Sequence, residues 1–240
     1  MSLSFEALLV LGIIGFYLYD SMMLLRYDEV VFSESFGKWT FAHPDNNLRV
    51  RHKALFLLNP LTPFKPTFRV AWSPNDSPLA EESTNELLKV VSLTRPLSII
   101  VMLLLAEMVL VVPAVIFTRG TGPLFLGTLL AVYLTILLAL GLVYANRAGL
   151  ALSNKRFAGL AFDSLACPPF AINMLRKITL PKAAGLNPVA YAHHHFTKEC
   201  FADLASKIKE RLNEEMDYEE DTEQSNALKA YHDHLTELAK

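Results

Sequence analysis

The chain has 240 residues, of which 52% are hydrophobic and 19% are charged, and its mean hydropathy is positive, at +0.30. A formal net charge of −2 excludes the broad basic field on which nucleic-acid-binding domains depend, so no nucleic-acid partner is expected. The two cysteines, Cys167 and Cys200, are too few for a disulfide framework, and we expect both to be reduced. The apolar residues are gathered in long blocks, which favours an integral membrane protein over a soluble one.

The first apolar block covers residues 7–19 without interruption and continues past Asp20 as far as Leu25. A cleaved signal peptide is the alternative interpretation, since its apolar region has a similar length. However, no Lys or Arg precedes the block, and no small-x-small cleavage pattern follows it. We therefore predict a retained transmembrane helix within residues 1–26.

Residues 27–96 change to an alternation of apolar and polar side chains, as at Trp39 and Phe41, which is typical of half-buried β-strands. We expect three or four short strands in one small antiparallel sheet. The proline-rich segment 59–66 is interpreted as a rigid connector between strands. A short linker helix over 84–94 is expected to lead into the next apolar block.

Two further apolar blocks, residues 97–117 and 124–145, are each long enough to cross a hydrocarbon core of about 30 Å as a helix. The first block contains a single charged residue and the second contains none. The segment between them, 118–123, is rich in Thr and Gly and is too short for a domain. We therefore predict two antiparallel transmembrane helices joined by a short external loop.

The distribution of Lys and Arg around these blocks predicts the orientation of the chain in the membrane. No Lys or Arg precedes the first block, and the loop 118–123 contains only Arg119. The other basic residues near the ends of the blocks lie on the opposite side: Arg26, Arg95, Arg147, Lys155 and Arg156. We expect an external N-terminus, cytoplasmic regions at 27–96 and after 145, and a multi-pass location, most simply in a bacterial inner membrane.

Glu107 is placed near the middle of its apolar block, where a charged side chain costs roughly 2.5–3.5 kcal/mol on insertion scales. Thr135 lies at about the same depth in the following block, and its hydroxyl is the expected hydrogen-bond partner. Pro113 leaves the carbonyl of Val109 without its helical donor. The first hypothesis is a polar clasp between helices or subunits; the alternatives are an ion or proton relay and a lipid- or quinone-facing role.

Small residues recur every four positions in the block 124–145, at Gly127, Ala131 and Ala139 with Thr135 between them. Such a stripe allows two helices in a membrane to approach closely. We therefore predict that this face of the helix packs against the helix that carries Glu107.

Residues 146–216 predict amphipathic helices on the cytoplasmic side, two of them over 147–165 and 169–180. A longer helix follows Asn187, and its apolar stripe is interpreted as a docking face, used by the chain itself or by another subunit. The stripe includes Phe196, Leu204, Ile208 and Leu212. Residues 217–240 predict an acidic hinge and a short terminal helix.

The run His193–His195, with Cys200 shortly after it, is the only cluster that suggests a metal site. Adjacent residues on a helix point about 100° apart, so three consecutive histidines do not converge on one ion. His195 and Cys200 are therefore weak candidate ligands, and we expect neither a metal nor a cofactor.

The leading functional hypothesis is a non-catalytic subunit, adaptor or assembly factor of a membrane protein complex. Its expected partners are membrane lipids and other subunits, or further copies of the chain. The alternative is an oligomeric ion or solute transport component that uses Glu107 as its polar site within the membrane. A second alternative is a membrane-bound enzyme acting on lipid-type substrates, but HExxH, GxSxG, P-loop and CxxC patterns are all absent from the sequence.

Overall fold

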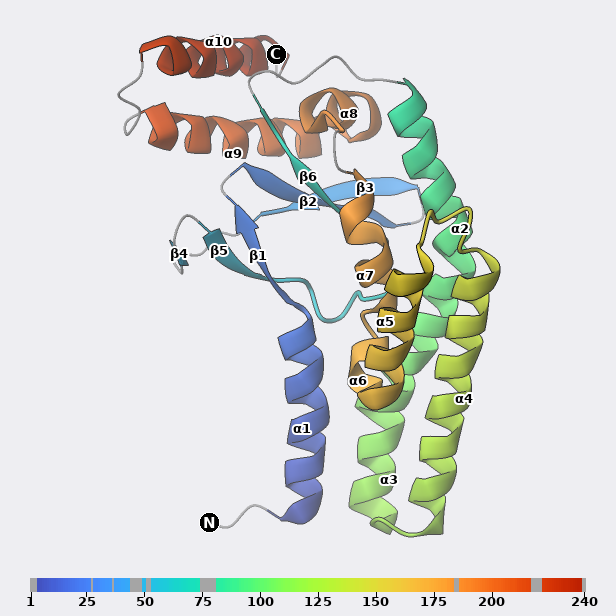
Figure 1. Cartoon of the computed structure of the whole chain (residues 1–240). Helices are drawn as coiled ribbons and strands as arrows, with labels where there is room; N and C mark the ends of the chain where they lie inside the picture. The colour runs from blue at the N-terminus through green and yellow to red at the C-terminus, as the bar shows by residue number, and fades with distance from the viewer. Residues whose placement is uncertain are drawn as a thin grey trace. The chain divides into compact units, whose positions relative to one another are not determined.

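The structure is a computed structural model that describes residues 4–26, 28–35, 37–43, 49–50, 53–73, 81–183, 186–216 and 222–238. The chain is mostly helical with a small amount of antiparallel β-structure (Figure 1). It divides into two compact units. The helical unit comprises Met1–Met23, Phe56–Thr67 and Leu88–Pro181, and the sheet unit comprises Leu24–Leu55, Phe68–Leu87 and Lys182–Lys240.

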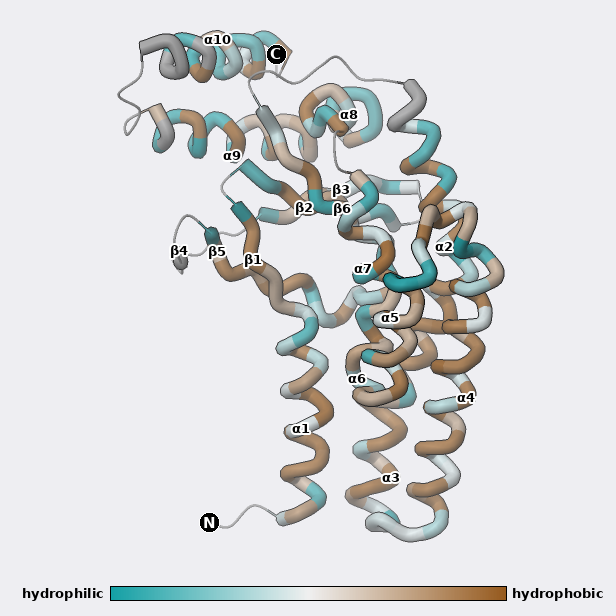
Figure 2. Tube along the Cα trace, in the orientation of Figure 1, coloured by the Kyte–Doolittle hydropathy of each residue, from teal (hydrophilic) through white to brown (hydrophobic). Residues whose placement is uncertain are grey.

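The helical unit is built on α1 (Phe5–Asp20), the greater part of α2 (Glu81–Ala106), α3 (Val112–Arg119) and α4 (Pro123–Ala145). These helices carry long hydrophobic stretches (Figure 2). The buried face of α4 repeats at helical spacing and consists mainly of branched aliphatic side chains: Val132, Ile136, Ala139, Leu140 and Val143.

Two helices in the described part of the chain are long and apolar enough to cross a membrane, judged by length and composition. They are Thr84–Arg119, with 36 residues, and Pro123–Ala145, with 23 residues. Only 28% of the most apolar window of each is buried inside the chain, whereas the core helix of a soluble protein is mostly buried. The two long helices and the tight turn between them agree with the sequence prediction.

The first helix is shorter than the predicted range 1–26. Ser4 caps its start by accepting a hydrogen bond from the backbone N–H of Ala7, and the helix ends at Asp20 after 16 residues. Met22–Arg26, which the apolar pattern assigned to the same helix, forms strand β1 instead. The helix ends because the Ser21 backbone carbonyl accepts a hydrogen bond from Leu58 N–H, a contact with a distant segment that the apolar pattern does not reveal.

The expected linker helix 84–94 and the block 97–117 form one helix that runs through Pro96. A π-helical segment, Glu107–Val111, interrupts the α-helical pattern, and the N–H of Val112 bonds to the carbonyl of Glu107. Proline lacks an N–H group, so the Val109 carbonyl has no donor at Pro113. The π-helical turn lies just before this proline in the chain.

The chain after α4 departs from the predicted helix 147–165. Residues 146–151 form turns, with Ala151 at a positive φ of 44°, and α5 (Asn154–Ala166) starts only where Ser153 caps it. The predicted helix 169–180 is divided into α6 (Pro168–Ala171), α7 (Met174–Thr179) and a 3-10 turn, Leu180–Ala183. Rings of Tyr144 and Phe157 lie 5.3 Å apart, so the start of α5 lies beside the end of α4.

The strands form two sheets of three rather than the single predicted sheet. One has the order β3–β2–β6, where β2 is Glu29–Ser35, β3 is Lys38–Ala42 and β6 is Thr67–Ala71. The other has the order β1–β5–β4, where β5 is Lys53–Leu57 and β4 is Arg49–Val50. The β2–β3 hairpin pairs Phe32 with Phe41 and Glu34 with Trp39, and Gly37 takes the positive φ, 83°, that its turn requires.

Three helices complete the sheet unit: α8 (Pro188–His195), α9 (Lys198–Met216) and α10 (Thr222–Leu238). The single helix predicted after Asn187 is therefore broken at Phe196 and Thr197. Aromatic rings pack α8 onto the sheet, with Tyr191 5.1 Å from Trp39 and 6.1 Å from Phe32. The predicted acidic hinge lies mostly outside the described residues, and the predicted terminal helix corresponds to α10.

Candidate functional sites

The predicted contact between Glu107 and Thr135 is present in the helical unit. Thr135 Oγ1 lies 3.1 Å from Glu107 Oε1 and 3.0 Å from the carbonyl oxygen of Ala131. The single hydroxyl proton is thus shared between two acceptors. Glu107 Oε2 is buried and has no hydrogen-bond partner among the described residues. The contact therefore joins the π-helical segment to α4 through one shared hydrogen bond.

The predicted small-residue stripe forms this helix contact only in part. Ala139 and Thr135 are buried, but Ala131 and Gly127 are exposed. A Cβ atom added at Gly127 would meet no atom within 4 Å, so this glycine does not permit a close approach inside the chain. Within the chain, bulky aliphatic residues such as Val132 and Ile136 make the contact, and the outer half of the stripe is uncovered.

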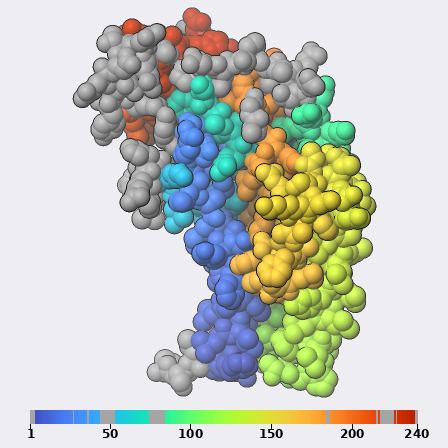
Figure 3. All heavy atoms as spheres, in the orientation of Figure 1, coloured from blue at the N-terminus to red at the C-terminus, as the bar shows by residue number. Residues whose placement is uncertain are grey.

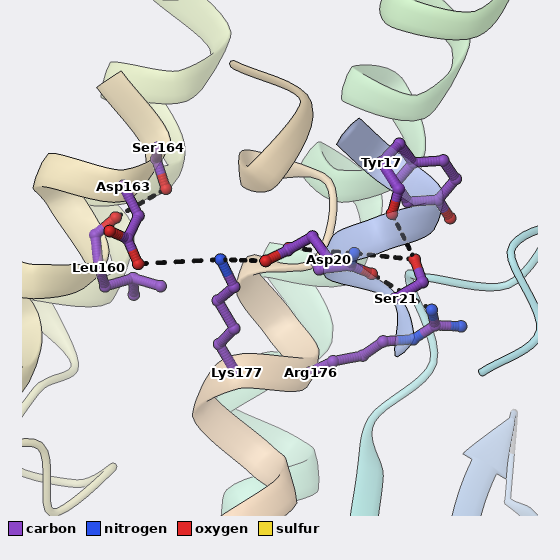
Figure 4. Close-up of polar contacts among 9 residues, drawn as sticks. Tyr17, Asp20, Ser21, Leu160, Asp163, Ser164, Arg176 and Lys177 are labelled. Atoms are coloured by element: carbon purple, nitrogen blue, oxygen red, sulfur yellow. Dashed lines mark hydrogen bonds and ion pairs between the residues drawn. The ribbon is translucent and has the colours of Figure 1, made fainter. Parts of the chain in front are cut away.

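A second polar cluster, which sequence reasoning did not identify, lies where α1 ends beside α7. We call it the Asp20 cluster, and it consists of Tyr17, Asp20, Ser21, Asn173, Arg176 and Lys177. Figure 4 labels all of these residues except Asn173. Asn173 Nδ2 donates to Asp20 Oδ2 at 3.2 Å and to Ser21 Oγ at 2.9 Å. Segments about 150 positions apart are thereby connected through charged and polar side chains.

Arg176 is the most buried charged residue of the cluster, at 3% exposure. Its guanidinium donates to the Asn59 carbonyl at 2.6 Å and to Asn173 Oδ1 at 3.2 Å, while the Tyr17 hydroxyl donates to the neighbouring Pro60 carbonyl. Burial lowers the pKa of Arg176 to about 10, so the side chain stays charged at neutral pH. Arg176 therefore fixes the proline-rich connector to α7.

Lys177 makes two ion pairs, one with Asp20 inside the cluster and one with Asp163 outside it. Its Nζ atom lies 2.9 Å from Asp20 Oδ1 and 3.9 Å from Asp163 Oδ2, and it also stands 4.9 Å from the centre of the Phe170 ring. Figure 4 shows the lysine side chain extending between the two carboxylates, one on α1 and one on α5. The Asp20–Lys177 pair is mostly shielded, whereas the Asp163 side chain is 52% exposed. Lys177 thus connects α1, α5 and α7.

The predicted docking stripe on α9 is already covered inside the sheet unit. Leu204, Ile208 and Leu212 are completely buried, and Phe196 packs 4.9 Å from Phe32. Of the two uses expected for this stripe, packing within the chain is the one found. Leu204, Ile208 and Leu212 are therefore covered within the chain.

The weak metal candidates do not form a site. Among the residues that the structure describes, no group of three or more His, Cys, Asp or Glu side chains is placed to hold a metal ion. His195 stacks on Tyr191 at 4.4 Å, and burial, with a smaller effect of His194, lowers the pKa of His195. Burial raises the pKa of the Cys200 thiol. These residues therefore belong to the packing of the sheet unit.

The sequence contains one signal for the Asp20 cluster that the prediction did not use. Asp20 interrupts an apolar block, and Arg176 with Lys177 interrupts another, and charges inside apolar segments call for partners. Only the folded chain identifies those partners, because they are about 150 residues apart in the sequence. Comparison with known proteins adds no further assignment: no family model, curated protein or solved structure matches this chain.

Proposed function

We propose that the chain is an integral membrane protein with three transmembrane helices, formed by α1, the second half of the long helix Thr84–Arg119, and α4. Its N-terminus lies outside, and its sheet unit lies in the cytoplasm of a bacterial cell. We propose further that it acts as a non-catalytic subunit, adaptor or assembly factor of a membrane protein complex.

The observation that carries the proposal is the apolar surface that the two long helices leave uncovered. Large side chains that are at least half exposed occur along both: Ile99, Met102, Leu103, Leu110 and Phe117 on the first, and Leu126, Leu130, Leu134, Leu137 and Leu138 on the second. Soluble monomers rarely expose contiguous apolar patches of this extent. Lipid acyl chains and the helices of partner subunits are the surfaces that match them.

The polar groups of the helical unit favour a structural role. Thr135 contacts Glu107, and Lys177 contacts both Asp20 and Asp163, so these groups connect helices to one another. Interhelical hydrogen bonds and paired charges are the usual means by which membrane helices are held in register. An adaptor needs such a rigid framework and needs no reactive group.

The test of this function is gentle solubilisation of native membranes, purification through a terminal tag, and measurement of the native mass with identification of co-purified proteins. We expect a defined complex, either with other subunits or with further copies of the chain. A lone monomer in several mild detergents would contradict the adaptor role.

The orientation is tested separately with single-cysteine variants and a thiol reagent that does not cross membranes. Arg119→Cys, in the short turn before α4, should react in intact cells, whereas Lys155→Cys, at the start of α5, should react only after the membrane is opened. The reverse pattern would contradict the proposed orientation.

The π-helical segment at Glu107 favours a second candidate function, an oligomeric ion or solute transport component. π-Helical turns occur often at functional sites. Here the turn begins at a membrane carboxyl group whose Oε2 atom is buried without a partner in the described residues. Vesicles containing the purified chain would then conduct protons or cations, and Glu107→Gln would abolish the flux while leaving assembly intact. Equal fluxes in vesicles with and without the protein would exclude this function.

A further inference from the structure

We propose that α5 and α6 form a re-entrant hairpin that enters the membrane beside α4 and α1 and exposes one face to lipid acyl chains. The sequence assigned this segment to the cytoplasm. The inference rests on the proposed membrane location of α4, and it concerns residues 154–171, which follow the last proposed span.

The depth of the hairpin follows from its contacts with α4. The Arg147 guanidinium lies 4.6 Å from the centre of the Tyr144 ring. Tyrosine is enriched at the membrane–water interface, so we place Tyr144 at that level. Phe157, near the start of α5, lies beside this tyrosine. Near the end of α5, the Leu165 carbonyl accepts a hydrogen bond from the Tyr133 hydroxyl at 3.4 Å. Tyr133 precedes Tyr144 on α4 by a distance of about 16 Å along the helix axis, so α5 descends to about the middle of a 30 Å core.

Contacts with α1 also place α6 beside a proposed span. The rings of Phe16 and Phe170 lie 6.2 Å apart, edge to face, so α6 packs beside α1. Phe16 lies about 6 Å along the axis from Asp20, where α1 ends. Further along the chain, Lys177 meets Asp20, which lies one turn beyond Phe16 on α1. The segment therefore returns towards the side from which it entered (Figure 1).

The polarity of α5 changes along its axis as a re-entrant helix requires. Its first turn carries Lys155 and Arg156, which would lie at the level of the lipid headgroups, whereas its far end exposes Phe162 at 72% and Leu165 at 37% (Figure 2). Figure 3 shows α5 and α6 on the open surface of the helical unit, next to α1. Lipid acyl chains match this exposed apolar end of α5.

Backbone N–H groups at the turn of the hairpin bond within the chain, as irregular structure at membrane depth requires. Pro168 and Pro169 have no N–H group, so the start of α6 contributes two fewer donors. The N–H of Cys167 bonds to the Asp163 carbonyl at 3.0 Å, and that of Phe170 bonds to the Cys167 carbonyl at 2.8 Å. These two N–H groups are therefore bonded within the chain.

The side chains of the hairpin follow the same rule. The Ser164 hydroxyl donates to the Leu160 carbonyl at 2.8 Å, so it requires no external partner. Asp163 is the one exposed acidic residue of α5, and it faces Lys177. Lys177 in turn neutralises Asp20 at the end of α1, a helix of only 16 residues and about 24 Å. The Asp20 cluster thus places paired charges where the short first span ends.

Spin labels attached to single cysteines test the hairpin in the full-length chain, in vesicles of phosphatidylcholine and phosphatidylglycerol. The background replaces both native cysteines, as Cys167→Ala and Cys200→Ala. The variants are Phe162→Cys in the hairpin, Leu134→Cys on the exposed face of α4 at matching depth, and Lys155→Cys at the start of α5. Oxygen concentrates in the bilayer and a nickel chelate stays in water, so the ratio of the two accessibilities reports depth.

We expect the oxygen-to-nickel ratio at Phe162→Cys to match that at Leu134→Cys and to exceed that at Lys155→Cys several-fold. A ratio at Phe162→Cys equal to that at Lys155→Cys, with Leu134→Cys in lipid, would overturn the hairpin and leave the spans intact. A label shielded from both reagents would also overturn it, because protein rather than lipid would then cover this face. A nickel-accessible Leu134→Cys would instead overturn the membrane location of α4. Leu165→Cys repeats the test if Phe162→Cys does not reconstitute.

Discussion

Replacement of Thr135 by valine removes one hydroxyl from α4 and tests whether its contact with Glu107 holds the helices together. Valine has nearly the shape of threonine, so the change leaves no cavity at this buried position. It removes the hydrogen bond of 3.1 Å to Glu107 Oε1, which is the one hydrogen bond of this carboxyl group within the described part of the chain. Oε2 has no partner in the described residues, so in the variant the carboxyl group makes no hydrogen bond to any described residue.

The expected loss of stability is about 1 kcal/mol, because interhelical hydrogen bonds in membranes contribute about 0.6 kcal/mol on average and up to about 1.7. The proton is shared with the Ala131 carbonyl, which keeps the value below that maximum. A loss of this size raises the unfolding equilibrium constant about fivefold. Reversible unfolding of the full chain in mixed micelles, by titration with a denaturing detergent, measures it.

Thr128→Val is the matched control on the same helix. Thr128 also donates to the carbonyl four residues earlier, at 2.9 Å from the Leu124 oxygen, and its side chain makes no hydrogen bond to another helix among the described residues. If both variants lose the same stability, the contact between Glu107 and Thr135 does not hold the helices together. A double-mutant cycle of Thr135→Val with Glu107→Gln isolates the pair, and a coupling energy near zero would lead to the same conclusion.

Three further predictions address the rest of the chain. Lys177→Met leaves Asp20 without its ion pair and should destabilise the helical unit by about 1–3 kcal/mol. The double variant Lys177→Met/Asp20→Asn should recover part of this stability. If detergent unfolding shows no recovery, the result argues against the pairing. Ile208→Ala in the buried stripe of α9 should lower the free energy of unfolding by about 2–5 kcal/mol, whereas Ser206→Ala at an exposed position should change it little. Equal unfolding midpoints for the two variants would show that the stripe is not packed in the chain. The pKa of His195 is lowered in the folded state, so as pH falls the unfolded chain binds a proton at this residue before the folded chain does. The stability of the sheet unit should therefore fall as pH drops through about 6.5. His195→Phe should flatten this part of the pH profile, and an unchanged profile would contradict the lowered pKa of His195.

Local patterns predicted the elements whose structure depends on neighbours in the sequence. The apolar blocks 97–117 and 124–145 are helical, and the alternation around Trp39 and Phe41 forms a strand of an antiparallel hairpin. Even the partner of Glu107 was predictable, because two helices joined by a tight turn place residues at equal distances from that turn side by side. In each case the spacing of side chains along the chain was sufficient to predict the element or the contact.

Elements that depend on distant partners were predicted less well. The apolar run through Leu25 suggests a longer helix, but β-pairing and the contact of Ser21 with Leu58 convert its end into a strand. The stripe on α9 is apolar whether it faces another subunit or its own sheet, and only the fold shows that Leu204 and Ile208 are covered within the chain.

The sequence by itself determined that this chain has long apolar helices, a small antiparallel β-structure and one carboxyl group in the middle of a helix, because periodicity and composition are local properties. Only the tertiary structure decided that Asp20, Asn173, Arg176 and Lys177 meet, and that α5 packs along α4 with Leu165 beside Tyr133. The physical reason is that a buried charged or polar side chain requires a partner, but its sequence position does not say which residue that is. The partner depends on how segments that are distant in the sequence pack together.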